Sequence, residues 1–150
     1  MILDIEQIKN LLPHRDPFLF LDSCKILEKG KKGIGYKKFT VDEYFFKGHF
    51  PNNPIVPGVV LIETIAQTAG VVVSESLANS KDKSVLFTSV SNAKFRKPVK
   101  PDDDIIIKVE LINKVKAVYK FHGEAMNGQN RICEAIFSAM ILNKSSSEIL

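Results

Sequence analysis

One segment constrains the fold more than any other: residues 58–77, GVVLIETIAQTAGVVVSESL, are the only long helical candidate and are apolar almost all the way round. A surface helix carries one apolar stripe and one polar face, whereas a helix that is apolar on every side must be covered by other elements. We therefore expect this helix to lie in the middle of the fold.

The remaining long segments favour strands. Residues rich in β-branched and aromatic side chains fill 83–92, 104–114, 116–126 and 131–143, a composition typical of strands. Apolar and charged residues alternate along 104–111, which indicates a half-buried strand. Short connections suit antiparallel neighbours. The predicted fold class is therefore α+β, with an antiparallel sheet wrapped around one long central helix.

The N-terminal part is predicted to hold a short helix and two strands. Asp4 followed by Gln7, with apolar residues at helical spacing, predicts a capped helix that Pro13 ends. Residues 18–27 and 33–40 are predicted strands on either side of the turn-forming segment EKGKKG.

Length and composition predict one globular domain. The chain has 150 residues, of which 45% are hydrophobic and 25% are charged, the balance of a domain with a real core. We expect a single domain over 1–150, with residues 144–150 as a frayed tail because they lack periodicity. The net charge of +4 is too small to indicate nucleic-acid binding.

The sequence predicts a cytoplasmic protein without membrane insertion. It has no run of about 18 uncharged apolar residues, and Asp4 and Glu6 stand where a signal peptide would carry positive charge. Cys24 and Cys133 lie far apart in apolar stretches, without the spacing of metal ligands. We expect both to be buried, reduced thiols, and we expect no metal site.

Polar groups appear inside otherwise apolar sequence in residues 45–67, FFKGHFPNNPIVPGVVLIETIAQ. Its prolines stiffen the backbone, and Pro57-Gly58 opens the long helix. The amides around Gly58, Val59 and Val60 should lack intrahelical acceptors, so they can bind a negatively charged oxygen. Glycine at the first of these positions lets a substrate approach the backbone closely.

Two side chains in this segment suit proton transfer. Glu63 lies about one and a half turns inside the helix, between apolar neighbours that make an ionised carboxylate costly, so it could act as a general acid. His49 is the histidine nearest in sequence and can take a proton near neutral pH. Each also has a structural reading, as a hydrogen-bonded loop histidine or a solvent-facing glutamate. Gln67 could contact substrate or, as we favour, bind a neighbouring carbonyl.

The other two histidines are expected to lie outside the chemistry. His14, in PHRDP, is expected to anchor the N-terminal segment. His122 shares the outward face of its predicted strand with Lys120, so we expect it to be solvated.

Three segments, LPHRDPFLFLD (12–22), GHFPNNPIVPGVVLIETIAQ (48–67) and AKFRKPVKPDD (93–103), together resemble the 3-hydroxyacyl-[acyl carrier protein] dehydratases of bacterial type II fatty acid synthesis. The resemblance implies a hot-dog fold, and a homodimer or trimer of dimers with sites at the dimer interfaces. It also implies that His49 and Glu63 form the catalytic pair, supplied by different subunits. Gly58 would offer its amide to the thioester carbonyl.

The implied reaction is dehydration of (3R)-3-hydroxyacyl-[acyl carrier protein] to the trans-2-enoyl product, in fatty acid and lipid A biosynthesis. His49 would be the base and Glu63 the acid, with neither metal nor organic cofactor. A sister family that also isomerises the double bond has aspartate in place of Glu63, so the glutamate favours the plain dehydratase. The chain departs from the pattern at Asp16, where an aromatic residue is usual, and at Asp102, where glycine is common.

Several interpretations stay open at this point. Acyl carrier proteins are acidic, and Lys94, Arg96, Lys97 and Lys100 could dock one or could form a solvated basic strand end. A hot-dog thioesterase would use a helix-terminal amide against the same thioester. A non-catalytic acyl-binding module on the same fold is a third reading, although it has no reason to bury a carboxyl.

Overall fold

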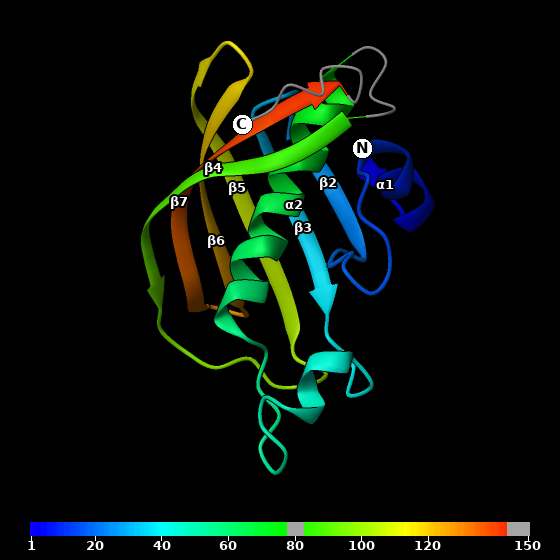
Figure 1. Ribbon diagram of the computed structural model, residues 1–150, viewed down its shortest axis with the longest axis vertical. Helices are drawn as coiled ribbons and strands as arrows, with labels where there is room; N and C mark the ends of the chain where they lie inside the picture. Colours follow the sequence, from blue (N-terminus) through cyan, green and yellow to red (C-terminus); the bar gives the residue numbers. More distant parts are fainter. Residues whose placement is uncertain (78–82, 144–150) are drawn as a thin grey trace.

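One curved antiparallel sheet and one long helix make up the body of the protein (Figure 1). The computed structural model describes residues 1–77 and 83–143, so the predicted fraying of 144–150 lies outside the described residues. In chain order the elements are β1 (Ile2–Leu3), α1 (Ile5–Leu11), β2 (Ser23–Glu28), β3 (Lys32–Lys38), the 3-10 helix η1 (Tyr44–Lys47), α2 (Gly58–Ser76), β4 (Lys83–Phe95), β5 (Asp104–Val115), β6 (Val118–Asn127) and β7 (Asn130–Asn143).

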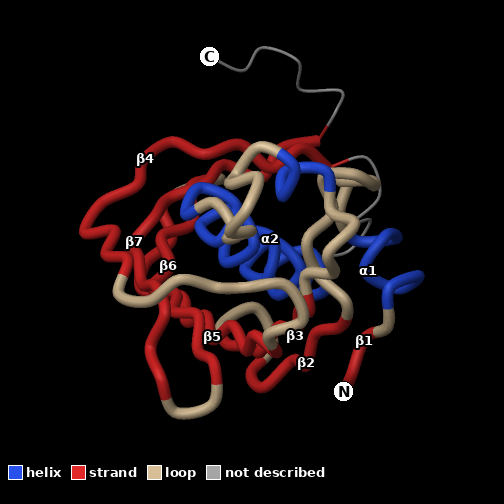
Figure 2. The backbone as a smooth tube through the Cα atoms, turned by 90° about the horizontal axis from the view of Figure 1, so that it is seen from below, coloured by secondary structure: helices blue, strands red, loops and turns tan. Residues whose placement is uncertain are grey.

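The sheet curls around α2, as the view from below shows (Figure 2). The helix is buried from Val60 to Ser74 except at Glu63, which confirms the predicted central helix. By length and composition α2 could cross a membrane, but 78% of its apolar window is buried inside the protein. Its environment is therefore that of a core helix. The close packing requires Gly123 on β6, where an added Cβ would lie 2.2 Å from Ile65 Cγ2.

The seven strands follow the order β1-β2-β3-β5-β6-β7-β4, and every neighbouring pair is antiparallel. β4 therefore forms one edge of the sheet. On β5 the predicted alternation holds, because Ile105, Ile107 and Val109 are buried while their neighbours are not. This arrangement of one sheet around one helix is the hot-dog fold that the resemblance implies.

The short N-terminal helix is confirmed, with a reciprocal capping box between Asp4 and Gln7. The predicted strand at 18–27 is wrong at its beginning, because β2 starts only at Ser23. Residues 13–22 are here called the N-terminal strap. Among the described residues, only its last residue, Asp22, bonds to a strand, since its N–H donates to the Tyr36 carbonyl of β3 at 2.9 Å, whereas Phe18 and Phe20 bond to a helix side chain. The N–H of Phe20 donates to Gln67 Oε1 at 2.7 Å, and Gln67 Nε2 donates to the Phe18 carbonyl at 2.9 Å.

The predicted buried thiols are also confirmed. Cys24 and Cys133 are both free and buried. Burial raises the pKa of the Cys24 thiol to about 12 and that of the Cys133 thiol to about 11. Neither sulfur therefore has thiolate character near neutral pH.

Asp102, one of the two departures noted in the sequence, has a backbone φ of 70°. Glycine adopts this left-handed conformation without strain, and aspartate tolerates it better than most residues do. The Asp102 N–H donates to the Phe39 carbonyl at 2.7 Å. The backbone geometry explains why glycine suits this position and how aspartate can replace it.

Candidate active site

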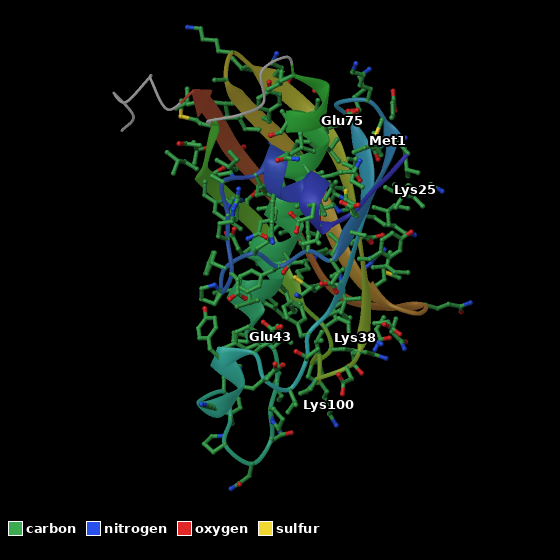
Figure 3. All side chains as sticks on the ribbon, turned by 90° about the vertical axis from the view of Figure 1, so that its right-hand side faces the viewer. Met1, Lys25, Lys38, Glu43, Glu75 and Lys100 are labelled. Carbon is green, nitrogen blue, oxygen red and sulfur yellow. The ribbon has the colours of Figure 1, made fainter. Side chains whose placement is uncertain are left out.

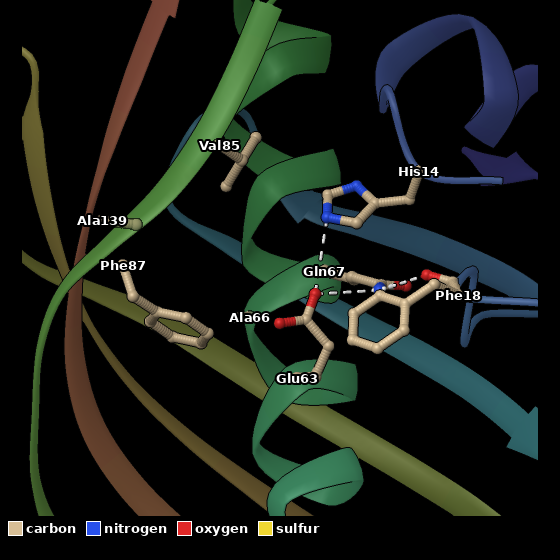
Figure 4. Close-up of a pocket in the computed structure, with 8 residues that line it drawn as sticks. All are labelled: His14, Phe18, Glu63, Ala66, Gln67, Val85, Phe87 and Ala139. Atoms are coloured by element: carbon tan, nitrogen blue, oxygen red, sulfur yellow. Dashed lines mark hydrogen bonds and ion pairs between the residues drawn. The ribbon is translucent and has the colours of Figure 1, made fainter. Parts of the chain in front are cut away.

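Glu63 points from α2 into a cavity of about 220 Å³ (Figure 4). One wall comes from the N-terminal strap and the opposite wall from β4 and β7. The lining residues are His14, Phe18, Glu63, Ala66, Gln67, Val85, Phe87 and Ala139. Apart from three polar side chains, the lining is apolar, which suits a site that must exclude bulk water.

The two oxygens of the Glu63 carboxyl have different surroundings. Oε2 accepts a hydrogen bond from Gln67 Nε2 at 2.9 Å and lies 3.4 Å from His14 Nε2. Oε1 has no hydrogen-bond partner among the described residues, and it points toward the side of the cavity where Phe87 lies (Figure 4). The structure thus adds two polar neighbours to the apolar ones that the sequence indicated: Gln67 holds one oxygen and His14 Nε2 lies close to it, while the other oxygen faces the cavity.

Gln67 joins the strap to the helix. Its side chain is only 1% exposed and makes three hydrogen bonds, to the Phe18 carbonyl, the Phe20 N–H and Glu63. This confirms the favoured reading of Gln67 as the partner of a neighbouring carbonyl. A fully paired amide of this kind fixes both groups that it connects.

His14 lies in the Glu63 cavity, which the sequence reading missed. Its side chain is 15% exposed, and its Nδ1 is buried without a hydrogen-bond partner in the described part of the chain. The anchoring expected of His14 is supplied by Arg15, whose guanidinium donates to the carbonyls of Lys9, Leu12 and His14. The signal available in the sequence was the LPHRDP segment itself, which belongs to the family pattern but carries no local chemical clue.

His49 is held in the loop between η1 and α2. Its Nδ1 lies 2.8 Å from the Ile55 carbonyl. Because a carbonyl only accepts, Nδ1 must donate, which leaves the lone pair of the neutral ring on Nε2. The Ile55 N–H donates back to the His49 carbonyl at 2.9 Å, and the ring stacks on Phe50 with centroids 4.2 Å apart. The imidazole is thus oriented with a basic nitrogen available.

A second pocket, of about 420 Å³, lies where α2 begins. It is lined by His49, Ile55, Val56, Gly58, Leu61, Phe95, Arg96, Lys97, Pro98 and Val99. The structure therefore brings His49 and Gly58 together, as the sequence predicted.

The start of α2 offers two free amides instead of the three expected. In the described structure the N–H groups of Gly58 and Val59 have no acceptor, but that of Val60 donates to the Pro57 carbonyl at 2.9 Å. An added Cβ at 58 would lie 2.7 Å from Cε1 of the exposed Phe95 ring, so a larger residue here would force the ring to move. The aromatic ring thus packs directly against the backbone that carries the free amides.

Glu63 and His49 are not brought together within the chain. Their two pockets share no lining residue. Each pocket holds part of the predicted constellation: one contains the imidazole and the free amides, the other contains the carboxyl.

The basic cluster, made up of Lys94, Arg96, Lys97 and Lys100, is partly paired with neighbouring side chains. Arg96 pairs with Glu134 at 3.1 Å, and hydrogen bonding from Arg96 lowers the pKa of that carboxyl. Lys97 Nζ donates to Asn130 Oδ1 at 3.0 Å. Lys94 and Lys100 are exposed, and Lys100 lies at the same end of the molecule as Glu43, opposite Glu75 (Figure 3).

His122 lies where the sequence predicted. It is half-buried on the outer face of β6, which it shares with the exposed Lys120, while Tyr119 and Phe121 point into the core. It lines neither of the two pockets described above.

Comparison with known proteins identifies the family. Residues 12–136 match the model of the FabA-like domain. The 3-hydroxyacyl-[acyl-carrier-protein] dehydratase FabZ of Granulibacter bethesdensis is 43% identical over 148 residues, covering 98% of this chain and 87% of that protein.

Two solved structures share the fold at low sequence identity. A chain of the dehydratase heterocomplex ApeI:P from Xenorhabdus doucetiae matches with a TM-score of 0.76 and 14% identity over 93% of both chains. A hypothetical thioesterase of Streptococcus pneumoniae, solved with coenzyme A, matches with a TM-score of 0.58 and 18% identity over 80% of this chain and 86% of that one. These two likenesses establish the architecture.

Proposed function

The chain belongs to the FabZ-type 3-hydroxyacyl-[acyl-carrier-protein] dehydratases, with a FabA-like domain over residues 12–136, and we propose that it converts (3R)-3-hydroxyacyl-[acyl carrier protein] to the trans-2-enoyl product and water. The reaction would serve fatty acid biosynthesis, and lipid A biosynthesis as the family resemblance implies, in the cytoplasm. One observation carries the mechanism. His49 and Glu63 are each held through one atom, which leaves His49 Nε2 and Glu63 Oε1 available.

His49 is the base in this proposal. The bond from Nδ1 to the Ile55 carbonyl fixes the tautomer and the ring orientation, so Nε2 can take a proton from the carbon next to the thioester carbonyl. A positioned general base typically contributes about 10²- to 10⁴-fold to a rate.

The free amides at the start of α2 stabilise the charge that this step creates. Loss of the α-proton builds negative charge on the thioester oxygen, and the N–H of Gly58, together with that of Val59, would donate to it. Donors at a helix N-terminus are aligned before the reaction, and one such donor is typically worth about 3–4 kcal/mol in the transition state.

Glu63 is the acid. Its free oxygen, Oε1, would carry the proton and deliver it to the 3-hydroxyl as the bond between carbon and oxygen breaks, so that the oxygen leaves as water and the double bond forms. One proton then resides on His49, and Glu63 is ionised. Proton transfer through solvent returns His49 to its neutral form and Glu63 to its acid form. No bound metal ion or organic cofactor takes part in these steps.

The separation of the two pockets supports a site shared between subunits. In the proposed homodimer, His49 of the partner subunit faces Glu63. Large apolar side chains are exposed near both pockets, with Val59 76% exposed and Phe95 55% exposed. Phe87 and Val90 are also exposed on β4, an edge strand of the kind that pairs with another chain. A trimer of such dimers is what the family resemblance implies.

The acyl carrier protein is the proposed partner of the basic cluster. Arg96 and Lys97 line the His49 pocket, and Lys94 and Lys100 are exposed. An acidic carrier docked here would bring its thioester to the start of α2. Charge complementarity of this kind mainly guides encounter and orientation.

In the thioesterase alternative, water hydrolyses the thioester, and neither acid catalysis by Glu63 nor a departing 3-hydroxyl is involved. One assay separates the two activities and the non-catalytic binding module. The protein is incubated with a 3-hydroxyacyl thioester, and the 2-enoyl thioester and free thiol are measured together. Dehydration gives the enoyl product with no free thiol; thioester hydrolysis gives thiol alone, and a binding module gives neither.

A further inference from the structure

We propose that His14 is a positioning residue that orients the Glu63 carboxyl and stabilises the carboxylate formed when Glu63 gives up its proton. The inference rests on the proposed role of Glu63 as the acid. It makes the N-terminal strap a part of the active site, beyond its contribution to the fold.

The contacts of the two Glu63 oxygens indicate that His14 helps to orient the carboxyl. Gln67 Nε2 and His14 Nε2 approach the same oxygen, Oε2, at 2.9 and 3.4 Å. The two residues belong to different segments: Gln67 lies on the next turn of α2, and His14 lies on the strap (Figure 4). With one hydrogen bond and a second nitrogen close to Oε2, Oε1 is the oxygen that meets the cavity, so the catalytic proton has a defined position.

The protonation of His14 follows from its other nitrogen. Nδ1 is buried without a partner among the described residues. A doubly protonated ring would leave a charged, unpaired N–H at that position, which is costly in a buried site. A neutral ring with its proton on Nε2 leaves only a lone pair unpaired and places the N–H on the nitrogen that lies 3.4 Å from Glu63 Oε2.

This donor acts more strongly after proton transfer than before it. A hydrogen bond to an ionised acceptor is roughly twice as strong as one between neutral groups, so His14 Nε2–H stabilises the Glu63 carboxylate more than the neutral acid. An interaction that strengthens along the reaction raises kcat and leaves KM almost unchanged. The contact of 3.4 Å is long for a hydrogen bond, as catalytic contacts commonly are before substrate binds.

Arg15 provides a matched control. It neighbours His14 on the strap and donates to the carbonyls of Lys9, Leu12 and His14, but it does not line the Glu63 cavity. Arg15→Ala therefore loosens the strap without removing a group that faces the carboxyl. A purely structural role for His14 predicts that the two residues behave alike.

The test is a double-mutant cycle in the full-length protein with a 3-hydroxyacyl thioester as substrate. His14→Ala, His14→Gln and Arg15→Ala are each made in the wild type and in Glu63→Ala, and kcat, KM and Tm are measured. We expect His14→Ala to lower kcat about tenfold, the loss of one hydrogen bond to a charged group, with KM changed less than about twofold. His14→Gln, which keeps an N–H donor, should restore most of the rate. In Glu63→Ala, His14→Ala should cost nothing further.

The outcomes separate the two proposals. Equal losses from His14→Ala in both backgrounds, a loss confined to KM, or no rescue by glutamine would overturn the role of His14. The role of His14 would also be overturned if Arg15→Ala lowered kcat in the wild-type background but not in the Glu63→Ala background. If the Glu63→Ala rate is too low to measure, the glutamine rescue and the kcat against KM comparison decide the question. Wild-type activity in Glu63→Ala alone would instead refute the proposed role of Glu63.

Discussion

His49 and Glu63 line separate pockets of the same chain, His49 beside Gly58 at the start of α2 and Glu63 beside Phe87 of β4. The proposed base, His49, and the proposed acid, Glu63, therefore do not line the same pocket. This separation is what a site shared between two copies of the chain, as proposed above, would require.

His49→Ala should abolish turnover while changing Tm little, because the ring contributes one loop hydrogen bond, to Ile55, and little core volume. The matched control is His122→Ala, a half-buried histidine on the outer face of β6, which should keep wild-type activity. Turnover and thermal unfolding are measured on both. A His49→Ala activity within about tenfold of the wild type would remove His49 from the mechanism, since general bases contribute more than that.

Glu63→Gln keeps the shape of the side chain but provides no carboxylic proton. We expect kcat to fall by about 10²-fold or more, measured as formation of the 2-enoyl thioester. Glu75→Gln, on the same helix but outside the Glu63 cavity, serves as the control and should retain activity. An unchanged kcat in Glu63→Gln would assign Glu63 a structural role.

Gly58→Ala should lower kcat/KM by more than about tenfold, because displacing one oxyanion donor typically costs 10²-fold or more. The added Cβ would lie 2.7 Å from Phe95 Cε1, so the ring or the start of α2 must move. Phe95→Ala removes the obstruction. The cost of Gly58→Ala should therefore be smaller in a Phe95→Ala background; equal costs in both backgrounds would show that crowding by Phe95 is not the cause.

Charge reversal at Lys97 and Lys100 should raise KM for carrier-bound substrate, and this effect should weaken as salt rises. Arg96 is left intact because reversing it would also break the pair with Glu134. The control reverses Lys29 and Lys120, two exposed lysines outside the His49 pocket. A small thioester substrate should respond little to either pair. If both substrates respond alike to the first pair, this surface does not dock the carrier.

Much of the fold could be predicted because local pattern and burial agree. The helix at 58–77 is apolar on nearly every face, and such a segment must be covered by other elements. The strand predicted at 18–27 began too early because the partner of its first residues is the side chain of Gln67, far along the sequence. Periodicity reports how a segment alternates, and it cannot report a hydrogen bond made 47 residues away.

The site was predictable where one segment contains its parts. His49 and Gly58 lie in one proline-rich stretch, and they share a pocket. His14 was missed because its relation to Glu63 arises only when the strap folds across α2. The free amide expected at Val60 was wrong for a local reason, since its N–H turns back to the Pro57 carbonyl in the first helical turn.

The most direct measurement is complementation between two inactive variants. His49→Ala and Glu63→Ala chains are mixed in equal amounts and co-refolded, and activity is compared with the wild type after native mass spectrometry has shown mixed dimers. Random pairing makes half of the dimers mixed, and each mixed dimer has one intact site and one site lacking both groups, so a shared site predicts roughly a quarter of wild-type activity. Mixed dimers that remain inactive would contradict the interface site.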